Sequence, residues 1–295
     1  MKDAQRQKMG EADGFIAALD QSGGSTPKAL GLYGVSSESW SNDEEMFDLV
    51  HAMRTRIMTS PSFSGERILA AILFENTMKN TVSGMPTAEY LWSQKQIVPI
   101  LKVDKGLAEE IDGVQLMKPM SSLNETLASA NEHGIFGTKM RSVIKQANGP
   151  SIENVVQQQF DIGLQILEAG LVPIIEPEVD ITIPDKKEAE DLLYKNIKRR
   201  LDRIEPSKKV MLKLSLPEHD NFYEPLTRHP NILRIVALSG GFEKKIAVGR
   251  LRQNNKMIAS FSRALTEGLK SNSPEKEFEE QLDQTIQSIF EASLT

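Results

Sequence analysis

Two stretches, VPIIEPEV at residues 172–179 and VMLKLSLP at residues 210–217, combine the apolar composition of a buried strand with charged side chains. Near-continuous apolar runs are typical of parallel strands that are packed on both faces. The charged residues within these runs are Glu176, Glu178 and Lys213. Because burying a charge without a partner is costly, we interpret both stretches as strands that present functional groups at one end.

Eight apolar runs of this kind alternate with longer amphipathic segments, which is the pattern of repeated βα units. The runs are 15–20, 68–75, 98–103, 136–143, 171–179, 210–216, 232–239 and 257–263. An eight-stranded parallel barrel with its helices takes about 250 residues around one core, so 295 residues need only one domain. We therefore predict an α/β fold, a (β/α)8 TIM barrel, with a single domain at residues 1–295 that includes a C-terminal helix.

Helical periodicity marks several of the connecting segments. Val156, Phe160, Leu164 and Leu167 recur at helical spacing, and Gly170 follows as a C-terminal cap. In the last helix, Ser273 is expected as the N-cap, with Pro274 in the first helical position. Its apolar face, expected on the barrel exterior, consists of Phe278, Leu282, Ile286 and Ile289.

The composition excludes several classes of function. With 35 basic and 41 acidic residues the net charge is -6, which argues against a nucleic-acid partner and requires any anionic ligand to meet a local basic cluster. The absence of cysteine excludes disulfides, thiolate nucleophiles and zinc sites built on sulfur. No apolar run is long enough for a membrane helix, and the N-terminal residues lack the apolar core of a signal peptide, so we expect a cytoplasmic protein.

A regular spacing relates four of the charged residues within the runs. An interval of 37 residues, about the length of one βα unit, separates each of these residues from the next: Lys102, Lys139, Glu176 and Lys213. We therefore expect successive strands to direct them towards a shared centre. Each could instead be a strand residue with its charged head in water. That explanation would require a separate coincidence for every one of the charged residues, so we favour a functional site.

Lys213 is the candidate nucleophile. Only the neutral form of an amine attacks a carbonyl, and a free lysine with a pKa of about 10.4 is almost wholly protonated at pH 7. Desolvation by the surrounding apolar residues and the second ammonium of Lys139 would favour the neutral amine, as in Schiff-base enzymes. Glu176 and Glu178, two residues apart on one strand face, could supply the acid for carbinolamine dehydration, and Asp20 is a candidate base. The same carboxylates could also neutralise the lysines.

Two segments are candidate phosphate sites. TIM barrels often bind phosphate at the loops after strands seven and eight, where Ser239, Gly240 and Gly241 follow the seventh run and Arg263 is expected to end the eighth strand. A second site could form at QSGGSTP, residues 21–27, with Lys102 nearby. Two such sites would suit a bisphosphate.

The ordered motifs ALDQSGGS, LKVDKG, GTKMR, VPIIEPE, MLKLSLP, ALSGG and SFSRAL extend over most of the chain. Together they resemble the class I fructose-bisphosphate aldolase family, and the segments ALDQSGGSTPKAL and EEMFDLVHAMRTRIMTSPSF are similar to its shorter bacterial branch. The resemblance implies reversible, metal-independent cleavage of fructose 1,6-bisphosphate through a lysine Schiff base, without a cofactor. It leaves open the related tagatose bisphosphate and the oligomeric state.

The resemblance also implies roles for individual residues. Lys213 would form the Schiff base, Glu176 would transfer protons, Lys139 and Glu178 would be electrostatic partners, and Asp20 would assist carbon–carbon cleavage. The residues implied in phosphate binding or in the adjoining active-site region are Ser22, Ser25, Lys102, Arg141, Ser239, Gly240 and Arg263. Two departures are Gln21, which replaces an acidic residue of the animal enzymes, and the absence of their C-terminal tyrosine, since the last tyrosine here is Tyr223.

Three other functions are possible. A metal-dependent aldolase would need clustered histidines, whereas His51, His133, His219 and His229 are scattered, with His219 a minor candidate near the barrel mouth. A transaldolase-like enzyme or a deoxyribose-phosphate aldolase would share the lysine but need one phosphate site. A non-catalytic phosphosugar-binding barrel would not require lysine, acid and base together.

Overall fold

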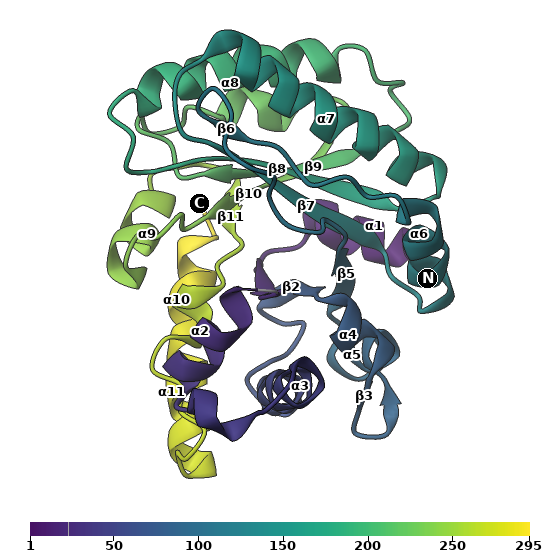
Figure 1. Ribbon diagram of the computed structural model, residues 1–295, viewed down its shortest axis with the longest axis vertical. Coiled ribbons are helices and arrows are strands. Elements are labelled where there is room, and N and C mark those ends of the chain that lie inside the picture. The colour runs from purple at the N-terminus through teal and green to yellow at the C-terminus, as the bar shows by residue number, and fades with distance from the viewer. Residues whose placement is uncertain (23) are drawn as a thin grey trace.

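The computed structural model describes residues 1–22 and 24–295 and contains a nearly closed barrel of eight parallel strands (Figure 1). The barrel order follows the chain, and every strand falls within or next to a predicted apolar run. The strands are β1 (Phe15–Leu19), β2 (Ile68–Leu73), β5 (Val98–Lys102), β7 (Gly137–Ile144), β8 (Val172–Val179), β9 (Val210–Ser215), β10 (Ile232–Leu238) and β11 (Met257–Ala259). The predicted (β/α)8 architecture is confirmed.

Helices cover the outside of the barrel between successive strands (Figure 1). They are α2 (Ser25–Tyr33), α3 (Asp43–Thr59), α4 (Glu75–Lys79), α5 (Thr87–Lys95), α6 (Leu123–Glu132), α7 (Gly149–Glu168), α8 (Lys186–Leu201), α9 (Lys244–Leu251), α10 (Arg263–Thr266) and α11 (Glu275–Ala292). Short 3-10 turns, η1 (Ser37–Ser39) and η2 (Glu224–Arg228), complete the connections. In the described part of the chain, no helix is long and apolar enough to cross a membrane.

Three short strands were not predicted. The strands β3 (Thr81–Val82) and β4 (Met85–Pro86) form a separate antiparallel pair, and β6 (Val114–Gln115) adds to the edge of β7. Two-residue strands are too short to leave a periodic pattern in the sequence.

The apolar residues form two clusters, one between the sheet and the helices and one inside the barrel. Inside, strand residues such as Ile72, Ile100, Met211 and Val236 are at most 1% exposed and fill the lower part of the barrel. The charged strand residues lie above this layer, towards the carboxyl ends of the strands. The apolar layer therefore forms the floor on which the site is built.

The two helices that we described in detail are present, with corrections at their boundaries and faces. Gly170 has φ +76° and follows α7, as predicted. Leu164, however, is 38% exposed, because the buried face of α7 includes Val156, Phe160 and Ile166 instead. The N-cap of α11 is Pro274 rather than Ser273, with no side-chain cap. Its apolar face, consisting of Phe278, Leu282, Ile286 and Ile289, is buried as expected.

The helix α1 (Lys2–Glu11) packs across the opposite, amino-terminal end of the strands. Met9 is fully buried in the interior cluster, and the Arg234 guanidinium donates hydrogen bonds to the carbonyls of Met9 and Ala12 at 2.9 Å each. Lys8 Nζ and Lys2 Nζ donate to the carbonyls of Gly65 and Gly170, which lie in the loops before β2 and β8. This helix therefore closes the barrel at the end away from the charged residues.

Candidate active site

A cavity of about 590 Å³ opens at the carboxyl ends of the barrel strands. It brings together nearly all the residues that the sequence singled out. Among its lining residues are Asp20, Ser22, Ser25, Lys102, Lys139, Arg141, Glu176, Glu178, Lys213, Ser239, Gly240 and Arg263. The one exception is Gly241, which lies beside the cavity: a Cβ built there would be 3.3 Å from Arg263 Nη2. The single shared centre that the 37-residue spacing predicted is therefore present.

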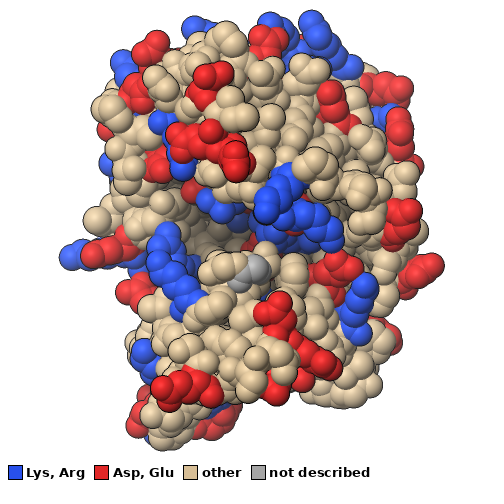
Figure 2. Space-filling view, viewed as in Figure 1, with Lys and Arg blue, Asp and Glu red and all other residues tan. Residues whose placement is uncertain are grey.

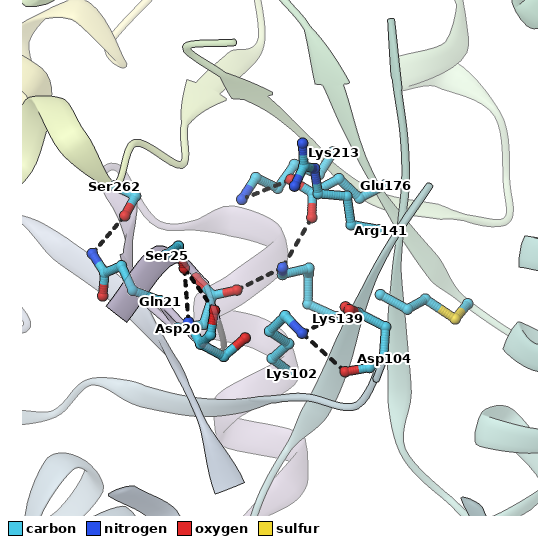
Figure 3. Close-up of polar contacts among 12 residues, drawn as sticks. Asp20, Gln21, Ser25, Lys102, Asp104, Lys139, Arg141, Glu176, Lys213 and Ser262 are labelled. Carbon is cyan, nitrogen blue, oxygen red and sulfur yellow. Dashed lines mark hydrogen bonds and ion pairs between the residues drawn. The ribbon is translucent and has the colours of Figure 1, made fainter. Parts of the chain in front are cut away.

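Lys139 lies at the middle of this site, between two carboxylates (Figure 3). Its Nζ atom is 2.5 Å from Asp20 Oδ2 and 3.1 Å from Glu176 Oε2. Asp20 extends from the end of β1, Lys139 from β7 and Glu176 from β8, so three strands contribute to one chain of charges. Each of the three residues is less than a tenth exposed, so their charges are compensated mainly by one another.

Lys213 joins the same chain from β9. Its Nζ atom lies 3.0 Å from Glu176 Oε1, and the residue is 4% exposed. The apolar residues of β9 flank it, as the sequence predicted, and Glu176 thus contacts one ammonium with each carboxylate oxygen. A carboxylate within hydrogen-bond reach of a buried amine can take a proton from it and return that proton to a bound ligand.

The charges shift the pKa values of the central groups. Burial opposes ionisation of Asp20, but the ammonium groups of Lys139, Lys213 and Lys102 outweigh it and hold its pKa below the usual value. Burial also disfavours the charged form of Lys139, yet the carboxylates of Asp20 and Glu176 outweigh that effect and raise its pKa. Asp20 is thus a carboxylate and Lys139 an ammonium at neutral pH.

Glu178 and Arg141 form a second pair nearer the mouth of the cavity. Arg141 Nε donates a hydrogen bond to Glu178 Oε2. Burial raises the pKa of Glu178, although the Arg141 guanidinium acts in the opposite direction. The sequence grouped Glu178 with Lys139 and placed Arg141 among the anion-binding residues, but did not predict that these two would pair.

The sequence interpretation missed the partner of Lys102. Lys102 Nζ contacts Asp104 Oδ1 at 2.6 Å and donates to the Asp104 carbonyl at 2.9 Å, and Asp104 is 5% exposed. Asp104 also accepts a hydrogen bond from Gly106 N. A signal was present, because Asp104 directly follows an apolar run and belongs to the quoted motif LKVDKG.

The first candidate phosphate segment follows β10. Gly240 has φ +59°, and a Cβ built there would lie 2.7 Å from Ile181 Cγ2, so this position requires glycine. Arg263 does not end the eighth strand, as we expected. β11 stops at Ala259, and Arg263 is the first residue of α10, because the chain leaves the strand and bends over residues 260–262.

The second candidate phosphate segment follows β1, and Gly23 within it lies outside the described residues. Ser25 Oγ donates to the Ser22 carbonyl at 2.8 Å and accepts from Ser22 N at 3.0 Å. The side chain of Gln21 points elsewhere: its Nε2 donates to Ser262 Oγ at 2.7 Å (Figure 3). Neither this contact nor the buried Arg54 behind the loop was predicted, because both join segments that are distant in the sequence.

The four histidines lie away from this constellation. His51, His133 and His229 bond to Thr81 O, Ser129 O and Asp202 Oδ1, and His219 is exposed, so none lines the cavity. Across residues 1–22 and 24–295, no group of three or more His, Asp or Glu side chains has an arrangement that could hold a metal ion. The geometry therefore offers no support for the histidine-based alternative.

Basic side chains surround a hollow on the face that is shown in Figure 2. The cavity lining includes the basic residues Lys28, Lys102, Lys139, Arg141, Lys213 and Arg263. In a chain with a net charge of -6, this is the local basic cluster that an anionic ligand would need.

Comparisons with known proteins agree with the site. A family described as fructose-bisphosphate aldolase class-I matches residues 4–188. The chain is 58% identical over 291 residues to a fructose-bisphosphate aldolase class 1 of Synechocystis sp., covering 99% of this chain and 97% of that protein. It is 55% identical over 295 residues to the class 1 enzyme of Clostridium acetobutylicum, covering all of both chains. A third relative with the same description, from Porphyromonas gingivalis, is 51% identical over 294 residues, again with complete coverage.

A solved structure shows the same fold at much lower sequence similarity. Fructose-bisphosphate aldolase from Plasmodium falciparum, in a complex with TRAP and a small-molecule inhibitor, superposes with a TM-score of 0.77 at 20% identity. The match covers 99% of this chain and 93% of that one. The barrel architecture is thus retained where four-fifths of the aligned residues differ.

Proposed function

The chain belongs to the class-I fructose-bisphosphate aldolase family, and from this membership we infer that it cleaves fructose 1,6-bisphosphate reversibly into dihydroxyacetone phosphate and glyceraldehyde 3-phosphate. It is a metal-independent lyase of the Schiff-base class. One observation supports the assignment of residues: the buried Lys213 amine lies 3.0 Å from Glu176, within a chain of charges that ends at Asp20. The reaction is a step of glycolysis and, in reverse, of gluconeogenesis, and we propose that it occurs in the cytoplasm.

Schiff-base formation would use Lys213 and Glu176. Lys213 gives one proton to Glu176, and the resulting neutral amine attacks the C2 carbonyl of the open-chain ketose, so that a carbon–nitrogen bond forms and the carbonyl π bond breaks. A second proton passes from the nitrogen to the carbonyl oxygen, which becomes a hydroxyl. Glu176 then returns its proton to that hydroxyl, which leaves as water, and the nitrogen lone pair completes the iminium. The 3.0 Å distance between Lys213 Nζ and Glu176 Oε1 suits this transfer.

Carbon–carbon cleavage would use Asp20. Its lowered pKa keeps it a carboxylate at neutral pH, so it can accept the proton of the C4 hydroxyl. The C3–C4 bond then breaks, its electron pair moves towards the iminium nitrogen to give an enamine, and the aldehyde leaves. Protonation of the enamine carbon and hydrolysis of the iminium release the ketone. Lys139 stays positively charged between Asp20 and Glu176 and stabilises both carboxylates.

Two anion sites would hold the substrate. We propose that Ser239, Gly240 and Arg263, with Gly241 beside them, bind one phosphate. The other phosphate would bind to Ser22, Ser25 and Lys102, with Arg141 contributing positive charge at the same mouth. Support comes from their shared cavity and from the close approach of Gly241 to Arg263.

Borohydride trapping tests this assignment directly. The protein is mixed with dihydroxyacetone phosphate, reduced, digested and analysed by peptide mass spectrometry, with and without EDTA. We expect one adduct, on Lys213, that is insensitive to EDTA and absent from Lys213→Met. The matched control is Lys187→Met, which removes an exposed lysine outside the cavity and should label normally. An adduct on another lysine, or activity that EDTA abolishes, would overturn the proposal.

A further inference from the structure

The barrel has a weak seam between its last and first strands. Elsewhere each pair of neighbouring barrel strands has two or more residues in parallel register; β7 and β8, for example, are in register from Gly137 and Val172 to Ile144 and Val179. Across the seam, no pairing of β11 with β1 is present among the described residues; one backbone hydrogen bond crosses it, from Ala18 N of β1 to the carbonyl of Phe261, two residues after the end of β11, at 3.4 Å. The backbone ladder therefore does little to fix these two strands relative to each other at the cavity end.

A side-chain contact bridges the same seam at the cavity. Gln21 follows β1, and Ser262 lies between β11 and α10. Gln21 Nε2 donates a 2.7 Å hydrogen bond to Ser262 Oγ, and Figure 3 shows this contact beside Asp20 and Ser25. It joins residues 241 positions apart in the sequence.

The backbone of Gln21 is itself held in place by a buried arginine. Arg54 of α3 is fully buried, and its Nη2 donates to the Gln21 carbonyl at 2.5 Å. Its Nη1 donates to Thr77 Oγ1 of α4 at 2.7 Å. Ser262, Gln21, Arg54 and Thr77 thus form a continuous chain of contacts around the rim, from the end of β11 past β1 to the helix after β2.

The two proposed phosphate sites lie on opposite sides of this seam. Ser22 directly follows Gln21 and Ser25 lies four positions after it, whereas Arg263 directly follows Ser262. A ligand with phosphates at both ends must contact both sides at once, so its binding depends on the distance between them. A ligand with one phosphate needs only one side.

We propose that Gln21 and Ser262 form a latch that sets the spacing of the two phosphate sites and thereby favours bisphosphates over monophosphates. Both are positioning residues, because they act through the loops that carry Ser22, Ser25 and Arg263. This inference rests on the proposed function and adds a determinant of substrate specificity to it. Small displacements of binding groups are costly, since a misplacement of about 1 Å can reduce turnover by about 10²-fold.

The test compares two substrates in four proteins: wild type, Gln21→Leu, Ser262→Ala and the double variant. Fructose 1,6-bisphosphate occupies both sites, and fructose 1-phosphate only one. We expect each single variant to raise KM for the bisphosphate about tenfold, while kcat/KM for fructose 1-phosphate changes less than about twofold. Since both changes break the same contact, the double variant should be no worse than the worse single one.

Controls separate the latch from a general loss of structure. Gln94→Leu makes the same change at an exposed glutamine on α5 and should leave both substrates unaffected. If Gln21→Leu does not fold, Ser262→Ala decides alone. Additive effects, equal losses on both substrates, or no change in KM for the bisphosphate would overturn the latch. A wild-type protein that fails to cleave the bisphosphate would instead refute the proposed function.

Discussion

Lys139→Met removes the ammonium that lies between Asp20 and Glu176, at 2.5 Å and 3.1 Å from their carboxylate oxygens. The two acidic residues are 8% and 3% exposed, so water cannot replace the lost partner. Removing one member of a buried ion pair typically costs about 3–5 kcal/mol, because the remaining charge stays desolvated. We expect the free energy of unfolding at pH 7 to fall by about that amount.

The pH dependence of this loss follows from the pKa of Asp20. In the wild type that pKa is lowered, so Asp20 contributes stability above the unfolded-state pKa of about 3.9 and loses it as the pH falls further. In the variant the main ammonium is absent and burial dominates, so the pKa of Asp20 should rise. Protonation then relieves the buried charge, and the difference between the two proteins should shrink from pH 7 to pH 4.

Urea unfolding followed by circular dichroism at both pH values measures this difference. The matched control is Lys145→Met, which breaks a surface pair with Glu110 whose side chains are 33% and 47% exposed. Such pairs contribute about 0–1 kcal/mol. The reasoning would be refuted if Lys139→Met lost no more stability than this control, or if its loss grew as the pH fell.

Three further predictions concern activity. Glu176→Gln keeps the side-chain size but removes the proton carrier, so kcat should fall about 10²–10⁴-fold and borohydride trapping should slow with it; an unchanged kcat would exclude the role. Asp20→Asn should abolish cleavage of the bisphosphate while dihydroxyacetone phosphate is still trapped, which separates the two chemical steps; loss of both would contradict it. Gly240→Ala should raise KM at least about tenfold, because its Cβ would lie 2.7 Å from Ile181, whereas Gly249→Ala, with open space around the added Cβ, should behave as wild type.

The barrel could be predicted because each of its strands leaves a local signal. Parallel strands are buried on both faces, so they read as continuous apolar runs, and the charged residues within them are conspicuous. The 37-residue spacing predicted that Lys102, Lys139, Glu176 and Lys213 would lie together, because one βα unit returns the chain to the same level of the next strand. These four residues do line one cavity.

Contacts between distant segments could not be predicted in the same way. The pairing of Arg141 with Glu178 and the bond from Gln21 to Ser262 depend on rotamers and on which loops meet at the rim. In the sequence, Arg54 cannot be distinguished from an exposed polar residue of an amphipathic helix, and only the fold shows that it is buried. The boundary error at Arg263 has a similar cause, because the sequence has no clear stop signal after Ala259, where the strand ends, and Phe261 is again apolar.

The docking of α1 has a consequence for the order in which the chain is built. Arg234 holds the carbonyls of Met9 and Ala12, which lie 225 and 222 positions earlier. Chains emerge from the ribosome amino-terminal end first, at about 5–20 residues per second. At least about ten seconds therefore pass between the synthesis of α1 and that of β10, and during this time α1 cannot form its contacts with Arg234. Its polar sequence, KDAQRQKMGE, keeps it from exposing a large apolar surface during that interval.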